Sequence, residues 1–144
     1  MTIDTKDEQK AWQKVINILS YRAYFSAELQ RKLITAGFSK EVIEAVIFRC
    51  QQAGYVNDRD HAERMIAMWT KKGYGPLRIR LELQKRGVKE VIPLENNASY
   101  IHLYLAKHLP KEPTEQQKAK VIRALVRRGF SLEVIFIALQ ECLS

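Results

Sequence analysis

Basic residues are the side chains of this sequence whose types and spacing most clearly indicate a chemistry, which is the binding of anions. The stretch from 71 to 89 contains a single acid, Glu82, and seven basic residues: Lys71, Lys72, Arg78, Arg80, Lys85, Arg86 and Lys89. Such a cluster favours an anionic partner, either phosphate or an acidic protein surface. The alternative is a solvated helix face on which Arg78 and Glu82 form an i, i+4 pair.

A second basic cluster lies further along the sequence and is a weaker candidate, because a terminal helical unit also needs surface charge for solubility. It consists of Lys118, Lys120, Arg123, Arg127 and Arg128. Aromatic residues occur near the ends of predicted helices: Tyr21, Tyr24, Phe25, Tyr55 and Tyr74. We expect them to pack between helices, and base stacking is the alternative.

No residues are expected to form a catalytic, metal or cofactor site. The three histidines, His61, His102 and His108, lack the spacing of metal ligands, and His108 lies on an apolar stripe that favours packing. Cys50 and Cys142 occupy equivalent positions on the apolar stripes of two predicted helices, so both are predicted to be buried. The sequence has no phosphate-binding glycine loop and no nucleophile beside a base in a familiar pattern. We therefore expect a binding protein and no enzyme.

The composition predicts a folded, cytoplasmic protein. The 144 residues are 47% hydrophobic, and 24 Lys and Arg against 16 Asp and Glu give a formal net charge of +8. This is enough apolar material for a core, with too little net charge to keep the chain disordered. No apolar run approaches the roughly 20 residues that a membrane span needs, and the first residues lack the pattern of a signal peptide. We expect no membrane partner.

A repeated pattern predicts an all-α fold. Three segments place an i, i+4 apolar pair before a glycine: Leu29, Leu33 and Gly37; Ile79, Leu83 and Gly87; Val121, Leu125 and Gly129. Each is typical of a short helix that ends in a left-handed glycine. Ser39 and Ser131 are suited to cap the helices that follow, and a further helix is predicted upstream of each segment. The chain therefore contains three tandem three-helix repeats.

We place these repeats at residues 11–54, 55–97 and 98–144, after an N-terminal tail at residues 1–10. The third helix of the central repeat is irregular, because Pro93, Asn96 and Asn97 occupy its core positions. That helix is expected to be shortened, shifted or lost. A three-helix unit of this size cannot bury its apolar faces alone, so we predict that the repeats stack into an elongated, curved, right-handed-type helical array.

Two motifs resemble those of the RecX regulatory family, which modulates the RecA recombinase. Gly54-Tyr55-Val56-Asn57-Asp58 is similar to the family's Gly-Tyr-(Leu/Ile)-Asp-Asp, and His61-Ala62 stands where the family usually has Phe-Ala. Gly73-Tyr74-Gly75-Pro76-Leu77-Arg78-Ile79 resembles the entry to the second helix of the central repeat, Gly-x-Gly-Pro-x-(Arg/Lys)-Ile. The resemblance covers residues 11 to 143.

The resemblance implies regulation by binding, in homologous recombination, DNA repair and the SOS response. Such proteins lie in the groove of the RecA filament on single-stranded DNA and inhibit its ATPase, coprotease and strand-exchange activities. The implied partners are the RecA filament and single-stranded DNA, directly or through the filament, with double-stranded DNA as a further candidate. We expect a monomer. Both filament blocking and disassembly stay open, and the alternative function is a helical DNA-binding module that acts through phosphate contacts.

Overall fold

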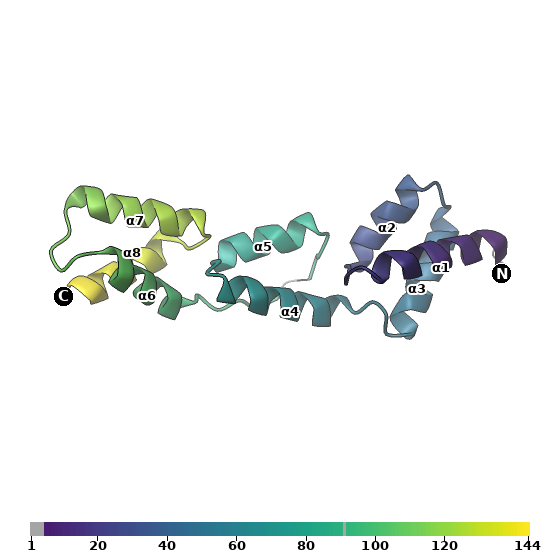
Figure 1. Ribbon diagram of the computed structural model, residues 1–144, viewed down its shortest axis with the longest axis horizontal. Helices are drawn as coiled ribbons and strands as arrows, with labels where there is room; N and C mark the ends of the chain where they lie inside the picture. Colours follow the sequence, from purple (N-terminus) through teal and green to yellow (C-terminus); the bar gives the residue numbers. More distant parts are fainter. Residues whose placement is uncertain (1–4, 91) are drawn as a thin grey trace. The chain divides into compact units, whose positions relative to one another are not determined.

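The computed structural model describes residues 5–90 and 92–144, and within these ranges it contains eight α-helices and no strands (Figure 1). The helices are α1 (Thr5–Leu19), α2 (Ser26–Thr35), α3 (Lys40–Gln52), α4 (Asp58–Lys71), α5 (Pro76–Lys85), α6 (Ala98–His108), α7 (Glu115–Arg127) and α8 (Leu132–Leu143). The predicted all-α fold class is confirmed. In the described part of the chain, no helix is both long and apolar enough to cross a membrane.

The contacts of the chain divide it into two compact units. The first unit contains the residues up to Arg64 together with Gln84–Lys89, and the second contains Met65–Leu83 together with Glu90–Ser144. Each unit has its own hydrophobic core, and helix α4 contributes residues to both units. The sequence-based boundaries of the three repeats stay a prediction.

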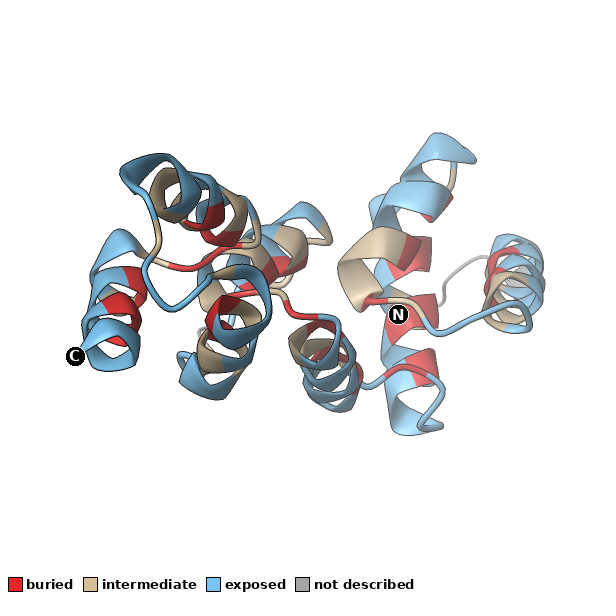
Figure 2. Ribbon diagram, turned by 60° about the vertical axis from the view of Figure 1, so that its left-hand side comes forward, coloured by how far each residue is buried: buried red, intermediate tan, exposed pale blue. Residues whose placement is uncertain are grey.

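In the first unit, α1 and α2 pack on α3. The predicted stripes supply the core, whose buried residues appear red in Figure 2: Ala11, Val15, Leu29, Leu33, Val42, Ile43, Val46, Ile47, Cys50 and Val56. Ser39 caps α3 as predicted, because its Oγ accepts from the Val42 amide at 3.3 Å. The burial of Cys50 is also confirmed, and desolvation raises the pKa of its thiol.

Helix α1 begins at Thr5, so residues 5–10 of the predicted N-terminal tail are helical. Asp7 and Glu8 lie in the first turn of α1, where carboxylates interact favourably with the positive end of the helix dipole. No Gly or Pro interrupts the sequence between this turn and the apolar stripe of α1. The rest of the predicted tail, residues 1–4, lies outside the described residues.

The second unit has its main core among α6, α7 and α8. Its buried residues are Ile101, Leu105, Val121, Leu125, Phe130, Ile135, Ala138 and Leu139. Helix α7 begins with a capping box in which Thr114 and Gln117 each bond the other's backbone amide, at 3.1 and 2.9 Å. The prediction that Cys142 is buried is wrong: it is exposed, because the last turn of α8 extends beyond the core that ends at Leu139.

The irregular third helix of the central repeat is absent. Between Lys85 and Ala98 the described residues form no helix, in agreement with the non-helical residues Pro93, Asn96 and Asn97. Asn97 adopts a left-handed conformation (φ 54°) at the start of α6, and its Nδ2 donates to the carbonyl of Thr70 at 3.4 Å. Among the described residues, a non-helical segment that ends at Asn97, the residue before α6, therefore replaces the helix.

The three glycines of the repeated pattern share a left-handed conformation but differ in their surroundings. The φ angles of Gly37, Gly87 and Gly129 are 91°, 83° and 102°, as the pattern predicted. A Cβ at Gly37 would meet open space, whereas one at Gly87 would lie 2.5 Å from Ala27 Cβ. One at Gly129 would overlap Arg78. Of these three turns, the one at Gly87 therefore lies against the start of α2 within the first unit. The one at Gly129 lies against the start of α5 within the second unit.

Candidate functional site

The candidate site lies in the second unit, where the start of α5 joins the turn after α7. The Gly75 amide donates to the Arg128 carbonyl at 2.7 Å, and the Leu77 amide donates to the Gly129 carbonyl at 3.0 Å. Pro76 is the first residue of α5, a position at which an N–H group would have no acceptor within the helix, so proline costs no hydrogen bond there. Through this junction, Arg78 of the first basic cluster and Arg128 of the second come close together, although they lie far apart in the sequence.

Tyrosine rings hold both of these arginines. The Arg78 guanidinium lies 3.9 Å from the centre of the Tyr74 ring, and that of Arg128 lies 5.5 Å from both Tyr100 and Tyr104. An exposed cation–π contact of this kind contributes about 0.5–1 kcal/mol and limits the rotamers of the arginine. We call these five residues the basic–aromatic surface. Both arginines are half-buried, so they combine fixed positions with access to solvent.

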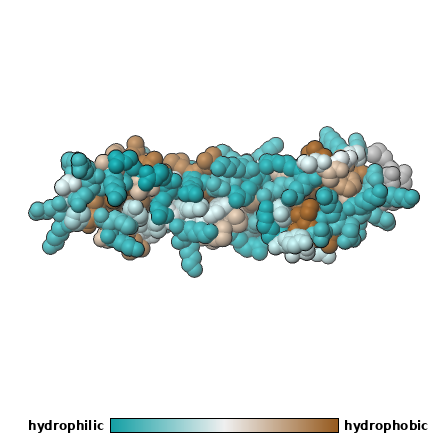
Figure 3. Space-filling view, turned by 45° about the horizontal axis from the view of Figure 1, so that its top comes forward, coloured by the Kyte–Doolittle hydropathy of each residue, from teal (hydrophilic) through white to brown (hydrophobic). Residues whose placement is uncertain are grey.

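Five other predicted basic residues of the second unit are exposed: Lys71, Lys72, Arg80, Arg123 and Arg127. Lys71 ends α4, Arg80 lies on α5, and Arg127 ends α7. They add positive charge to the unit that carries the basic–aromatic surface. The surface of the protein is largely hydrophilic in the view of Figure 3, where hydrophobic side chains form small separate groups.

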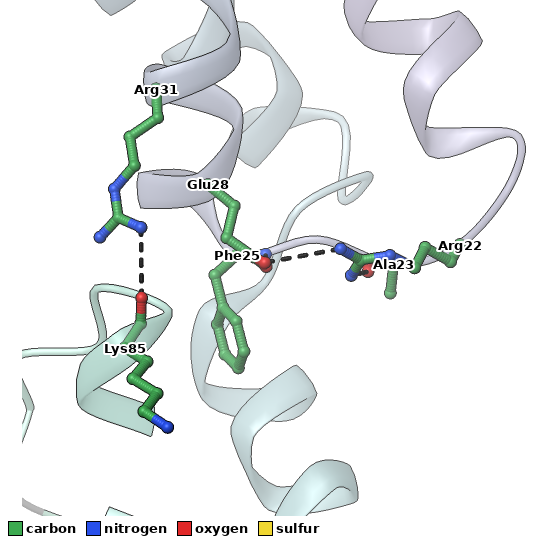
Figure 4. Close-up of polar contacts among 6 residues, drawn as sticks. All are labelled: Arg22, Ala23, Phe25, Glu28, Arg31 and Lys85. Atoms are coloured by element: carbon green, nitrogen blue, oxygen red, sulfur yellow. Dashed lines mark hydrogen bonds and ion pairs between the residues drawn. The ribbon is translucent and has the colours of Figure 1, made fainter. Parts of the chain in front are cut away.

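Lys85, Arg86 and Lys89 belong to the first unit, so the cluster predicted from 71 to 89 is divided between the two units. The end of α5 lies beside α2, since the Arg31 guanidinium donates to the Lys85 carbonyl at 3.2 Å (Figure 4). Lys85 and Lys89 are exposed and Arg86 is half-buried.

The sequence did not predict a basic pocket that lies between α1 and α2. It has a volume of about 460 Å³ and is lined by Lys14, Ile18, Arg31, Lys32, Thr35 and Ala36. Its three cations come from two helices and form no run in the sequence. The i, i+4 spacing of Lys14 and Ile18 placed both on one face of α1, but only the packing of α2 shows what this face meets.

The Gly-Tyr-Val-Asn-Asp motif joins two helices in the first unit. The Asp58 carboxylate accepts from the Ser26 amide at 2.8 Å and from its hydroxyl at 2.5 Å, so it stabilises the start of α2. Asn57 caps α4, because its Oδ1 accepts from the Asp60 amide at 3.1 Å. At the same corner, Glu28 accepts from the Phe25 amide and pairs with Arg22 (Figure 4). The motif residues Asn57 and Asp58 therefore have structural partners.

His61 lies beneath this corner in an apolar contact. Its ring stacks on Phe25 with centroids 4.1 Å apart, it is 8% exposed, and its Nδ1 has no hydrogen-bond partner. Desolvation lowers the pKa of His61; Arg64 and Arg22 lower it further, whereas the carboxylates of Glu28 and Asp58 oppose the shift. The neutral imidazole is thus the form that the fold favours.

We expect His61→Phe to stabilise the protein and to weaken the pH dependence of its stability. Phenylalanine keeps the stack on Phe25 and removes a buried unpartnered nitrogen, a change of about 1 kcal/mol at pH 7.5. Below the ordinary histidine pKa of 6.5, the unfolded chain takes up a proton at His61 more readily than the folded one, so the parent loses stability as the pH falls. Urea unfolding at pH 5.5 and 7.5 measures both effects.

His108→Gln is the control for this experiment, since His108 is exposed on α6. The benefit of His61→Phe should be larger at pH 5.5 than at 7.5, and the control should bring no comparable gain in stability, because it removes no buried unpartnered nitrogen. A parent and a His61→Phe variant that lose stability equally between these pH values would contradict the role assigned to His61.

Family models match two parts of the chain. The model of the first three-helix domain of RecX matches residues 11–50, and that of the third three-helix domain matches residues 105–139. Among the described residues, no group of three or more His, Cys, Asp and Glu side chains is placed to hold a metal ion.

Similar proteins cover nearly the whole chain. The regulatory protein RecX of Legionella pneumophila (strain Corby) is 32% identical over 143 residues, which span 92% of this chain and 94% of the relative. That of Cronobacter sakazakii (strain ATCC BAA-894) is 34% identical, over 85% and 86%. The crystal structure of RecX from Lactobacillus salivarius shares the fold, with a TM-score of 0.81, 20% identity and coverage of 96% and 98%. The chain belongs to the RecX family of regulatory proteins.

Proposed function

We propose that this protein regulates RecA by binding in the groove of the RecA filament on single-stranded DNA. In this role it inhibits or modulates the ATPase, coprotease and strand-exchange activities of RecA. It acts in the cytoplasm, as a monomer, and as a regulator it is not an enzyme. Its family supports a role in RecA regulation. The observation that carries the proposed site is the basic–aromatic surface, which the junction at Gly75 and Gly129 assembles.

The chemistry of this surface suits a nucleoprotein partner. A guanidinium offers five N–H donors in a planar fork, which match the oxygens of a phosphate or a carboxylate in pairs. Arg78 and Arg128 are oriented by tyrosine rings, so less side-chain freedom is lost when they bind. The net charge of +8 also accelerates approach to a polyanionic filament.

We also propose that the chain functions as three tandem repeats at residues 11–54, 55–97 and 98–144. The glycine turns support this organisation. Gly87 receives the start of α2 and Gly129 receives the start of α5, whereas Gly37, in the first repeat, faces open space. This is expected if the turns of the second and third repeats each lie against a helix of the repeat before them.

A titration of RecA ATPase on single-stranded DNA tests the proposed function. The protein should inhibit hydrolysis at concentrations well below that of RecA, because one bound regulator blocks a filament in which many protomers turn over. Bovine serum albumin at equal concentration controls for non-specific effects. The absence of inhibition at a molar excess over RecA would exclude the proposal.

A second candidate function is direct binding of DNA through phosphate contacts. It is favoured by the contacts of Arg128 with two tyrosine rings, because paired cations and aromatic rings are typical of single-strand binding surfaces. Affinity for a naked oligonucleotide should then fall steeply with salt. Arg78→Glu or Lys85→Ala should lower the slope of log K against log salt by about 1 for each phosphate that the variant no longer neutralises. Fluorescence anisotropy at salt concentrations from about 50 to about 200 mM measures this slope.

A further inference from the structure

Three side chains on α6 and α8 form a chain of polar contacts that the proposed function does not use. His102 Nδ1 lies 3.4 Å from the Cys142 Sγ, and its Nε2 lies 3.1 Å from a carboxylate oxygen of Glu141. All three residues belong to the second unit. The order is thiol, imidazole and carboxylate, which is the order that activates a nucleophilic cysteine.

The carboxylate determines which nitrogen of His102 carries the proton. Because the negative charge of the Glu141 carboxylate lies 3.1 Å from Nε2, it favours the tautomer that carries its proton on Nε2. In the neutral ring, Nδ1 is then left with a lone pair that faces the thiol of Cys142. A proton that moves from Sγ to Nδ1 leaves a thiolate beside an imidazolium, and Glu141 stabilises that imidazolium from the other side.

His102 is the group on which this thiolate depends. Cys142 lies in the last turn of α8, where the negative end of the helix dipole disfavours an anion. The imidazolium offsets this effect. Cys142 is also exposed, so an oxidant or alkylating reagent can approach its sulfur. Cys50, by contrast, is fully buried in the core of the first unit and provides an unreactive reference in the same chain.

We propose that Cys142 is a site of reversible oxidative modification, by a hydroperoxide followed by a low-molecular-weight thiol. The thiolate attacks one oxygen of hydrogen peroxide, an S–O bond forms as the O–O bond breaks, and hydroxide leaves. The sulfur is oxidised to a sulfenic acid and the peroxide is reduced. The sulfenic acid then condenses with glutathione to a mixed disulfide and water. Because Cys50 is buried, the disulfide partner comes from outside the chain.

The test measures the chemistry of the thiol in the full-length protein. The rate of alkylation by iodoacetamide at pH 7 is followed by intact-protein mass spectrometry, and peptide mapping separates Cys142 from Cys50. In parallel, the protein is treated with hydrogen peroxide and dimedone to trap the sulfenic acid, or with peroxide and glutathione to form the mixed disulfide. Dithiothreitol should reverse the glutathione adduct and leave the dimedone adduct in place.

Variants of the two partners identify the cause of the reactivity. We expect His102→Gln to slow alkylation and dimedone trapping at Cys142 by about tenfold, since it removes the base. Glu141→Gln should slow them less, because it keeps the base and removes only the neighbouring negative charge. His108→Gln, a change of the same kind on the same helix, should leave both rates unchanged.

The outcomes separate clearly. Rates at Cys142 that exceed those of free glutathione and fall in His102→Gln support the proposal. Rates that equal those of glutathione in both parent and variant overturn it, as does an absence of any dimedone or glutathione adduct at Cys142. Circular dichroism confirms that each variant keeps the helical fold, which is expected because all three side chains lie at the surface.

Discussion

Gly129→Ala is expected to destabilise the second unit by about 3 kcal/mol. The residue has a left-handed φ of 102°, which costs a non-glycine residue about 1–2 kcal/mol. Its new Cβ would also overlap Arg78 Cβ and lie 2.5 Å from the Arg78 amide nitrogen. Relief of this overlap requires α5 to move away, which weakens the bonds from Gly75 and Leu77.

Gly37→Ala is the matched control, because Gly37 has a similar φ of 91° with open space where the Cβ would go. It should cost only the conformational part, about 1–2 kcal/mol. Thermal melting and urea unfolding give the two free-energy changes. Amide hydrogen exchange at Gly75 and Leu77 should accelerate in Gly129→Ala and stay unchanged in Gly37→Ala. Equal destabilisation by the two variants would show that the proximity of Arg78 is unimportant.

The same comparison shows how far the sequence predicts this fold. All three glycine turns, the serine caps of α3 and α8 and the capping box at Thr114 were predictable, because each depends on residues within one helical turn. The apolar stripes of α2, α3 and α7 were predictable for the same reason. Local rules, however, treat Gly37 and Gly129 as equivalent. Only the structure shows that one of them lies against another helix.

The error in burial concerns a position at which a helix extends beyond the core. Cys142 follows the same stripe as Ile135 and Leu139, yet it is exposed because it lies beyond Leu139, the last residue of α8 in the core. Helical periodicity identifies a face, and it contains no information on the length over which that face is covered. Helix α1 also has a first turn whose acids, Asp7 and Glu8, stabilise the helix through its dipole without a contribution to the core.

The candidate site was predictable in its residue types and only partly in its arrangement. Arg78 and Arg128 were both predicted, as members of separate clusters, and the bonds of Gly75 and Leu77 bring them together. Tyr74 was predicted to pack between helices, and it packs against the Arg78 guanidinium. The division of the chain into two units separates Lys85 from Arg78, although both lie on α5. The compact unit to which a residue belongs depends on long-range packing, which the spacing of residues in the sequence does not predict.

Arg78→Glu is expected to raise the concentration for half-maximal inhibition of RecA ATPase by about tenfold or more. The change removes a guanidinium that Tyr74 holds in place and puts a carboxylate at the centre of the basic–aromatic surface. A like charge opposite phosphate or acidic side chains costs more than the removal of an attraction, and tenfold corresponds to only about 1.4 kcal/mol. Arg78→Lys keeps the charge but removes the planar fork, so its effect should be smaller.

Lys40→Glu is the matched control for the charge-reversed Arg78 variant. Both substitutions lower the formal net charge from +8 to +6, so long-range attraction to the filament falls equally. Lys40 is exposed at the first position of α3, where a glutamate suits the helix dipole and compensates for the ion pair with Glu44. This variant should inhibit RecA nearly as well as the parent. If Arg78→Glu also inhibits as well as the parent, the start of α5 is not the surface that meets the filament, and the basic pocket at Lys14 and Lys32 becomes the next site to test.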